Sequence, residues 1–310
     1  MTEQALQPGV GGEAGPTVPK ADVRTRPRGP LGRLARRPGA MVALGFLLLV
    51  ALTAIFAPLI APHDPVVQDL ARSRQPPAFL DGGDTTYLFG TDEFGRDLLS
   101  RIIYGARISL FVGTVSATIA MLLGTTMGLI AGYFERRVGP TILRFADIQF
   151  SLPFYVIAIA VVALFGPSLR NLVILLSFWG WATYARTIAV TVSQLKRMEY
   201  VQASRLQWSS VARIMRVHLL PGVSSSVIVL WTTSVGGLIL VESALSFIGL
   251  GVQVPDFSWG SMLGGAQTEL QGAWWVAIVP GVFLTATIVA FYVLGDALRD
   301  ILNQPVPKDH

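Results

Sequence analysis

Cysteine is absent from the 310-residue sequence, which excludes disulfide bonds and thiolate chemistry. Histidine is nearly absent as well, because the only three are His63, His218 and His310, and no two of them are close in sequence. Zinc sites usually combine cysteine and histidine ligands at short spacings. We therefore predict no metal site in this chain.

The sequence also lacks the short motifs that carry nucleotide binding and hydrolysis. It has no Gly-x-x-x-x-Gly-Lys-[Ser/Thr] loop, so we do not expect the chain itself to bind ATP. It has no His-Glu-x-x-His motif and no supported set of serine, histidine and aspartate. The glycine-rich stretch Gly249–Gly251 is followed by a predicted loop rather than by a nucleotide-binding helix. We predict no catalytic residue and no cofactor, and hence no enzyme.

Charged residues are scarce. They make up 14% of the sequence, whereas a soluble domain usually carries about 25%. Hydrophobic residues make up 52%, and the mean hydropathy is +0.56. Lipid is therefore the expected solvent, and the predicted fold class is an all-α membrane protein. The net charge of +5 could suggest a nucleic acid partner, but its distribution indicates membrane orientation instead.

Long apolar stretches, rather than the length of the chain, set the predicted architecture. The first runs from Met41 to Ile60 without a charged residue. At about 1.5 Å per residue it can cross a hydrocarbon core of about 30 Å, and it is longer than the apolar region of a cleaved signal peptide. We predict six transmembrane helices: Met41–Ile60, Ile108–Ala131, Phe145–Phe165, Leu172–Val192, Val223–Ile248 and Trp274–Leu294.

Lysine and arginine are distributed unevenly between the loops that join these spans. If the N-terminus is cytoplasmic, 18 of the 24 Lys and Arg residues fall on the cytoplasmic side, as the positive-inside rule requires. Residues 1–40, rich in glycine and proline, then form a disordered basic cytoplasmic tail, and residues 304–310 form a second tail. We predict a multi-pass protein of the cytoplasmic membrane with both termini inside.

The predicted outer segment, residues 61–106, is more than a simple turn. Residues 61–90 are rich in proline, aspartate and glycine, and we expect an ordered or partly ordered loop there. Thr91 can then cap a short helix that lies in the outer membrane interface. Gly105 can end this helix before the second span begins.

Residues 193–221, between the fourth and fifth spans, are basic but not merely polar. Glu199–Gln207 is predicted to form one short helix, and Ser209 or Ser210 can cap a second. The second helix places four apolar side chains on one face: Val211, Ile214, Met215 and Leu219. Two such helices suit a surface pressed by a soluble partner. A solvated loop lying on lipid headgroups is the alternative that these residues leave open.

This loop resembles the ATPase-docking loop of the permeases of ABC importers. The similarity lies in Glu199–Arg205 and in the distal His218-Leu219-Leu220-Pro221. Further segments resemble the C-type permease of dipeptide, oligopeptide and nickel importers, over about residues 41–303. They are Ala57–Pro65, Gly90–Asp97, Ser100-Arg101, Gly105–Leu110, Glu242–Gly251, Ser258–Leu263 and Gly295–Asp300.

The resemblance implies a type I ABC importer permease fold, with residues 107–303 as the transmembrane core. It implies four partners: a second homologous permease, two ATPase subunits that bind the ATP, and an extracytoplasmic substrate-binding protein. Substrate, expected to be a di- or oligopeptide, would cross by alternating access. Nickel complexes, glutathione and haem-like cargo are alternatives, because the binding protein largely selects the substrate.

Two docking positions depart from the family pattern. Gln202 stands where the first family glutamate is usual, and Trp208 stands at the usual glycine. If that turn needs a positive φ, a non-glycine residue costs about 1–2 kcal/mol. We therefore expect a re-shaped turn with the indole packed on the partner or on a neighbouring helix. The resemblance assigns ATPase coupling to Glu199, Tyr200, Val201, Gln202, Ala203, Ser204, Arg205, Trp208, Leu220 and Pro221.

Acidic side chains inside the predicted spans form a second set of candidates. Glu242 either lines the translocation path or contacts the partner permease together with Ser243 and Ser246, or it is a packing carboxylate satisfied by those serines. Asp147 is expected to form a local ion pair with Arg144.

Four aromatic residues follow the fifth span: Phe257, Trp259, Trp274 and Trp275. Anchoring at the membrane interface is the default role for such side chains. The alternative is a role in gating or in contact with the binding protein, and Trp259 is included among the candidate path or permease contacts.

A secondary transporter or channel for small solutes is the rival from another class. It would need its own energy source or pore, yet paired intramembrane charges are nearly absent and the two halves of the chain show no repeat. A membrane enzyme would need a nucleophile or a metal set, and neither is apparent.

Overall fold

The computed structural model describes residues 30–208 and 210–302. Within these ranges all regular elements are helices, and an isolated antiparallel bridge joins Thr91 to Asp97. The all-α class is therefore confirmed. Residues 1–29 and 304–310 of the predicted tails lie outside the described residues, as does Ser209.

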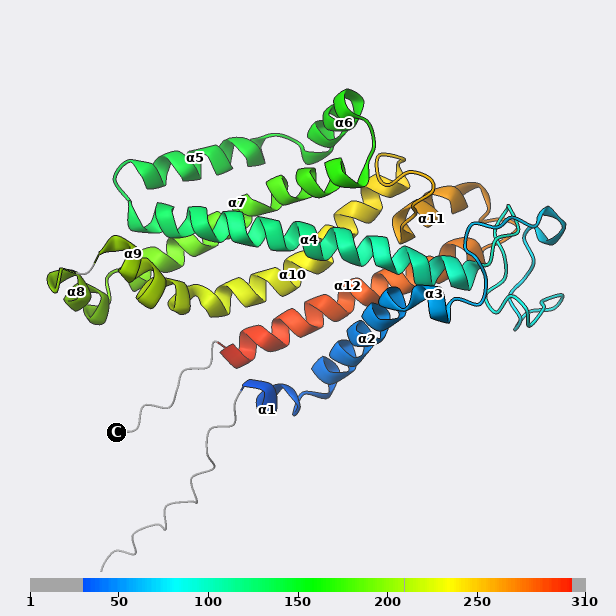
Figure 1. Cartoon of the computed structure of the whole chain (residues 1–310), viewed down its shortest axis with the longest axis horizontal. Helices are drawn as coiled ribbons and strands as arrows, with labels where there is room; N and C mark the ends of the chain where they lie inside the picture. The colour runs from blue at the N-terminus through cyan, green and yellow to red at the C-terminus, as the bar shows by residue number, and fades with distance from the viewer. Residues whose placement is uncertain (1–29, 209, 303–310) are drawn as a thin grey trace, which may run out of the picture.

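Five stretches of the described chain are long and apolar enough to cross a membrane, and a bent helix pair brings the number to six if it counts as one span. The five are α2 (Pro38–Ile55), α4 (Leu98–Tyr133), α7 (Leu169–Leu195), α12 (Trp275–Leu302) and the run Val211–Phe247. This last run comprises α9 (Val211–Ile214), the π turn η2 (Met215–Leu219) and α10 (Leu220–Phe247). Figure 1 shows these helices lying side by side in one bundle.

Shorter elements lie mainly at the two ends of this bundle. They are α1 (Pro30–Leu34), α3 (Ala57–Ile60), η1 (Leu70–Arg72), α8 (Glu199–Leu206), α11 (Trp259–Gly265) and η3 (Ala266–Thr268). The helix of the first span, α2, begins at Pro38 and ends at Ile55, whereas the predicted span runs from Met41 to Ile60.

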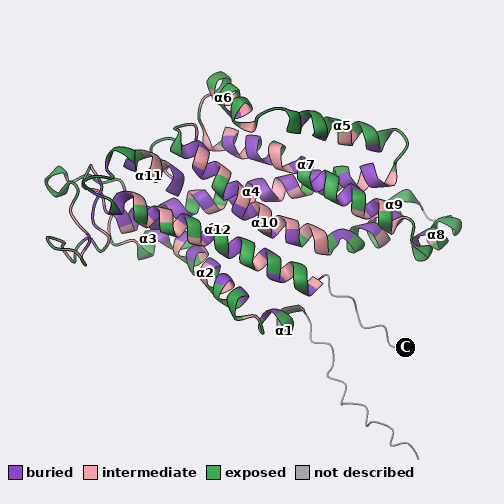
Figure 2. Ribbon diagram, turned by 180° about the vertical axis from the view of Figure 1, so that it is seen from behind, coloured by how far each residue is buried: buried purple, intermediate pink, exposed green. Residues whose placement is uncertain are grey.

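The predicted third span, Phe145–Phe165, is broken. It consists of α5 (Val138–Ser151) and α6 (Phe154–Phe165), which meet at 85°. Pro153 explains the break, because proline disfavours helical geometry at the residue before it and cannot donate a backbone hydrogen bond. Figure 2 shows both helices largely exposed, and Ala158 is the only buried residue of α6.

The separate interfacial helix predicted from Thr91 to Gly105 is wrong. Asp97 is the N-cap, and its carboxylate accepts a hydrogen bond from the Ser100 amide at 3.0 Å. From Leu98 the helix runs unbroken through Gly105 into the second span, so that α4 has 36 residues. A Cβ at Gly105 would lie 3.3 Å from the Trp259 ring, so this glycine serves close packing rather than helix termination.

Three glycines spaced four residues apart bring α4 and α7 together: Gly124, Gly128 and Gly132. A Cβ built on any of them would lie between 2.3 and 2.9 Å from a backbone carbonyl oxygen of α7. Small residues at this spacing let membrane helices approach to backbone contact. This stripe therefore fixes the central pair of the bundle.

Candidate functional site

The two helices predicted within residues 193–221 are present. α8 ends one residue earlier than predicted, at Leu206. Ser210 caps the second helix, where its hydroxyl accepts a hydrogen bond from the Arg213 amide at 3.3 Å. This second helix continues through η2 into α10 without a break at Pro221. The wider π turn absorbs the proline ring, which clashes with an ordinary α-helical turn.

α8 and α9 form a hairpin at the end of the bundle, and one apolar side chain anchors it. Val201 of α8 is fully buried. It belongs to a cluster that joins α7, the hairpin and α10: Ile188, Val192, Val201, Ile214, Leu219 and Val223. A polar contact adds to this anchor, with His218 Nε2 lying 3.2 Å from Ser204 Oγ. The hairpin is therefore held firmly on its inner side.

The outer side of the hairpin is open. Of the ten predicted coupling residues, Val201 is buried and Ser204 is half-buried. The exposed ones are Glu199, Tyr200, Gln202, Ala203, Arg205, Trp208, Leu220 and Pro221. Leu206, which the sequence analysis did not select, is 82% exposed next to them. Large apolar side chains on a rigid, outward surface are typical of a contact with a partner.

The turn after α8 keeps the geometry for which the family uses glycine. Trp208 has a φ of +58°, so the expected re-shaping of the turn is wrong. Trp208 is 94% exposed, so its indole does not pack on a neighbouring helix in the described part of the chain either. A left-handed tryptophan costs about 1–2 kcal/mol relative to glycine. The tip of the hairpin therefore combines a strained backbone with an exposed indole.

Glu242 of α10 is fully buried among hydroxyl groups. Its carboxylate accepts hydrogen bonds from Ser246 at 2.7 Å, Ser243 at 3.3 Å and Ser109 at 3.5 Å. This arrangement corresponds to the packing alternative, in which nearby serines satisfy the carboxylate. Glu242 does not face an open path in this conformation.

Two of the four aromatic residues that follow the fifth predicted span are buried inside the protein and do not lie at the membrane interface. Trp259 is fully buried, and its indole N–H donates to the Ile102 carbonyl at 3.0 Å. Trp275 is also buried, and its indole N–H donates to the Thr91 carbonyl at 3.2 Å. Only Trp274 is exposed enough to suit the interfacial role.

Asp147 pairs with a different arginine from the one expected. Its carboxylate forms a hydrogen-bonded ion pair with Arg186 of α7, 39 residues away in sequence. The expected local pair with Arg144 is wrong, because α5 packs against α7 and the Asp147 carboxylate contacts Arg186 there. The sequence held one indication of this pair, because Arg186 is a charged residue inside the predicted fourth span and needs a partner there.

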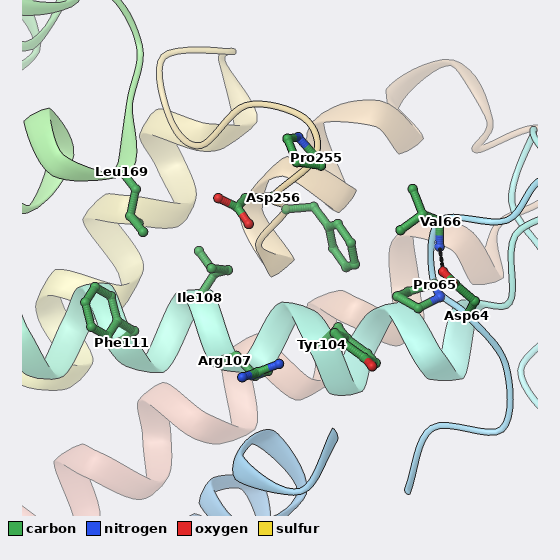
Figure 3. A pocket seen from close by; sticks show the side chains of 11 residues that line it. Asp64, Pro65, Val66, Tyr104, Arg107, Ile108, Phe111, Leu169, Pro255 and Asp256 are labelled. Atoms are coloured by element: carbon green, nitrogen blue, oxygen red, sulfur yellow. Dashed lines mark hydrogen bonds between the residues drawn. The ribbon is translucent and has the colours of Figure 1, made fainter. Parts of the chain in front are cut away.

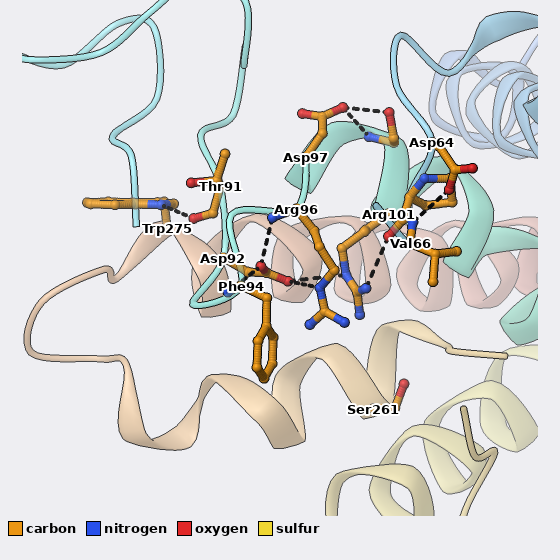
Figure 4. Close-up of polar contacts among 12 residues, drawn as sticks. Asp64, Val66, Thr91, Asp92, Phe94, Arg96, Asp97, Arg101, Ser261 and Trp275 are labelled. Atoms are coloured by element: carbon orange, nitrogen blue, oxygen red, sulfur yellow. Dashed lines mark hydrogen bonds and ion pairs between the residues drawn. The ribbon is translucent and has the colours of Figure 1, made fainter. Parts of the chain in front are cut away.

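The outer loop is fastened by a cluster of arginines and carboxylates, drawn in Figure 4. Asp92 accepts from the Arg96 guanidinium at 2.7 Å, and Arg101 lies 3.6 Å from the same carboxylate. Arg101 also donates to the Pro65 carbonyl at 3.3 Å. Arg96, through Asp92, and the N-cap Asp97 therefore order the start of α4.

A cavity of about 620 Å³ opens beside this cluster (Figure 3). Its walls come from α4, from the start of α7 and from two loops of the outer end. Charged and aromatic side chains share the lining: Asp64, Tyr104, Arg107, Asp256 and Phe257. Its lining therefore offers charges of both signs beside apolar side chains.

Comparison with known proteins decides the family. Residues 124–306 match the family described as binding-protein-dependent transport system inner membrane component, and residues 31–77 match the N-terminal transmembrane domain of oligopeptide transport permease C. The chain belongs to the binding-protein-dependent transport permeases. The secondary-transporter and channel alternative is thereby set aside.

Relatives of this permease carry names from peptide transport. The chain is 43% identical over 270 residues to the di/tripeptide transport system permease protein DppC of Pseudomonas aeruginosa, covering 87% of this chain and 89% of that protein. It is 40% identical to the dipeptide transport system permease protein DppC of Bacillus subtilis, over 87% and 83% of the two chains. It is 35% identical to the glutathione transport system permease protein GsiD of Pectobacterium atrosepticum, over 93% and 94%.

One contact of the outer end predicts a pH dependence of the permease's stability. Arg74 forms an ion pair with the buried Glu269, including a hydrogen bond from Nη2 to Oε1 of 2.8 Å. The hydrogen bonds from Arg74 hold the pKa of Glu269 below its ordinary value of 4.5. A lowered pKa stabilises the fold above pH 4.5, and this contribution is lost as the pH falls through the lowered pKa.

We expect Glu269→Gln to lower the thermal unfolding temperature at pH 7, and we expect the difference from the wild type to shrink at pH 3. Unfolding of the two proteins in detergent at both pH values measures this. Asp81→Asn, which neutralises an exposed carboxylate of the outer loop, is the control and should show no such change. An equal difference at both pH values would contradict the ion-pair explanation.

Proposed function

We propose that this permease forms one half of the membrane part of an ATP-driven importer of di- and tripeptides. A second homologous permease supplies the other half, and two ATPase subunits bind and hydrolyse the ATP. An extracytoplasmic binding protein delivers the peptide. The observation that carries this proposal is the exposed face of the α8–α9 hairpin, which is anchored on its inner side and which no part of residues 30–208 and 210–302 covers.

The same surface supports an orientation for the permease in the membrane. The start of α2, the end of α12 and the α8–α9 hairpin lie toward one end of the bundle, and the loop 61–97 with α11 lies at the other (Figure 1). A hairpin that docks cytosolic ATPases faces the cytoplasm. The start of α2 and the end of α12 then face the cytoplasm as well, as the distribution of lysine and arginine predicts for a protein of the inner membrane.

The outer end then faces the binding protein. Its surface is held in shape by the Arg74–Glu269 pair and by the cluster around Asp92. The cavity between Arg107 and Asp256 offers charges of both signs to a docked protein. Substrate recognition by the binding protein and passage through the two permeases complete the proposed cycle.

Reconstitution of the complete complex tests this function. The permease, its homologue, the two ATPases and the binding protein are placed in vesicles, and uptake of a labelled dipeptide is followed with and without ATP. The absence of any ATP-dependent uptake would contradict the proposal. Orientation is read from Thr85→Cys and Gln207→Cys, because the chain has no other cysteine. A membrane-impermeant thiol reagent added from outside should label the first and spare the second.

The exposed indole at the hairpin tip leads to a second test. We expect Trp208→Gly to weaken association with the ATPases by roughly tenfold or more, as for an aromatic anchor at an interface. Glycine relieves the left-handed strain, so a gain or no change would mean that the tryptophan only burdens the turn. Pull-down of the ATPases measures this. Trp274→Gly, which removes an exposed tryptophan at the other end, is the matched control.

A further inference from the structure

The Asp147–Arg186 pair lies at membrane depth and is open to its surroundings. Arg186 is four residues, or about 6 Å, from Ala182 at the middle of α7. Nevertheless the side chains are 59% and 45% exposed for Asp147 and Arg186. The guanidinium also lies over the Phe150 ring, 4.7 Å from its centre. Two charges are therefore presented outward from the inner half of the predicted span Leu172–Val192.

Such a pair cannot face lipid, since charged side chains at this depth are costly unless they meet protein or water. The break between α5 and α6 indicates the same thing independently. Gln149, two residues before the break, donates to the Trp179 carbonyl at 2.9 Å, which places the break close to the middle of α7. Interrupted helices at membrane depth occur where they are buried in protein or line a water-filled cavity.

The surface of α7 around the pair carries two hydroxyl groups, which can bind water, beside the exposed apolar Val190. Thr183 and Thr187 are exposed on the same face as Arg186. Thr187 bonds to the Thr183 carbonyl of its own helix, so it needs no partner from another chain. Arg186 has five N–H donors and Asp147 has two acceptor oxygens, and their mutual hydrogen bond uses only a part of this capacity. The remaining donors and acceptors are available to a solute.

We infer that Asp147 and Arg186 bind the two charged ends of a zwitterionic peptide as it crosses the membrane. The Arg186 guanidinium takes the C-terminal carboxylate, for which its planar fork is suited, and the Asp147 carboxylate takes the N-terminal ammonium. This inference rests on the proposed function, because a peptide importer is the setting in which a zwitterion passes.

The geometry assigns the ion pair a second role when no peptide is present. The ends of an extended dipeptide lie about 7 Å apart, since each residue spans at most about 3.3–3.6 Å. Asp147 and Arg186 are in direct contact, so they must separate to admit the peptide. In the empty state each side chain neutralises the other. When the peptide binds, the ion pair between Asp147 and Arg186 is broken. Two ion pairs between these side chains and the ends of the peptide replace it.

The double variant Asp147→Asn with Arg186→Gln tests this inference. In the reconstituted complex we expect dipeptide uptake per ATP hydrolysed to fall by roughly tenfold or more, as for the loss of hydrogen bonds to charged groups. Assembly with the second permease and ATP hydrolysis stimulated by the binding protein should persist. The matched control is Arg37→Gln with Asp300→Asn, a 2.6 Å ion pair with side chains 40% and 58% exposed at the inner end. It should transport like the wild type.

Thr187→Cys supplies a measurement that does not depend on removing the charges. A water-soluble thiol reagent should modify this position in the assembled complex, and a dipeptide delivered by the binding protein should slow the modification. Absence of modification, or modification that the dipeptide does not slow, would overturn the inference.

The outcomes separate this inference from the function on which it rests. Normal uptake by the double variant would overturn the peptide site and leave the importer intact. Loss of assembly with the second permease would overturn it as well, because the pair would then be a contact between subunits. Failure of the wild-type complex to take up dipeptide would overturn both.

Discussion

Ala203→Asp is expected to abolish association of the permease with its ATPases and, with it, dipeptide uptake. Ala203 is an exposed, small residue in the middle of α8, where a partner helix or groove can approach closely. Docking would bury the new carboxylate without a partner, which typically costs about 3–5 kcal/mol. Because 1.4 kcal/mol corresponds to a factor of ten, the affinity should fall by more than about a hundredfold.

Pull-down of the ATPase subunits and ATP hydrolysis stimulated by the binding protein measure this effect. Ala203→Ser keeps the side chain small and should retain both activities. Ala71→Asp introduces the same charge at an exposed alanine of the outer loop and should leave association unchanged. Retention of association and stimulated hydrolysis by Ala203→Asp would remove α8 from the docking surface.

Gly128→Leu is expected to prevent formation of the folded permease altogether. A Cβ at this position would lie 2.7 Å from the Ile188 Cβ and 2.9 Å from the Ala185 carbonyl oxygen. Carbonyl oxygens of a helix cannot move aside as side chains can, so α4 and α7 would have to separate. The expected loss of folding free energy is well above the roughly 1–3 kcal/mol that ordinary overpacking costs.

The amount of protease-resistant permease in the membrane measures this effect. Gly45→Leu is the matched control, because no atom lies within 4 Å of the Cβ that it would add to α2. We expect the control to accumulate normally. Normal accumulation of Gly128→Leu would mean that α4 and α7 do not depend on this close contact.

Hydropathy predicted the spans because lipid exposure is a property of whole segments. It could not predict the break between α5 and α6, since the flanking residues are apolar on both sides. The signal was Pro153, whose effect is local and which a window average conceals. The N-cap of α4 was also predicted at the wrong residue. Asp97, not Thr91, caps this helix, because its carboxylate accepts hydrogen bonds from both the amide and the hydroxyl of Ser100.

The candidate site was predictable to different degrees. The α8–α9 hairpin followed from amphipathic spacing and capping, and its boundaries were correct within a residue or two at the described positions. The partner of Asp147 was not predictable, because Arg186 becomes adjacent only when α5 folds back along α7. The burial of Trp259 was equally hidden, since it depends on the space that Gly105 leaves on α4. Capping residues and apolar spacing, which are local in the sequence, predicted the helices. The side-chain contacts depend on packing between distant segments and could not be predicted in this way.

The continuity of α9, η2 and α10 gives the permease a lever. The run Val211–Phe247 has 37 residues and is therefore about 55 Å long, with the docking hairpin at one end and Glu242 near the other. A tilt of about 10° around its midpoint would swing each end by roughly 5 Å. A force on the hairpin either tilts this rod as a whole or flexes it at the π turn before Pro221. The bending stiffness of five residues, Met215–Leu219, therefore sets how much of a displacement at the hairpin reaches the end of α10 that carries Glu242.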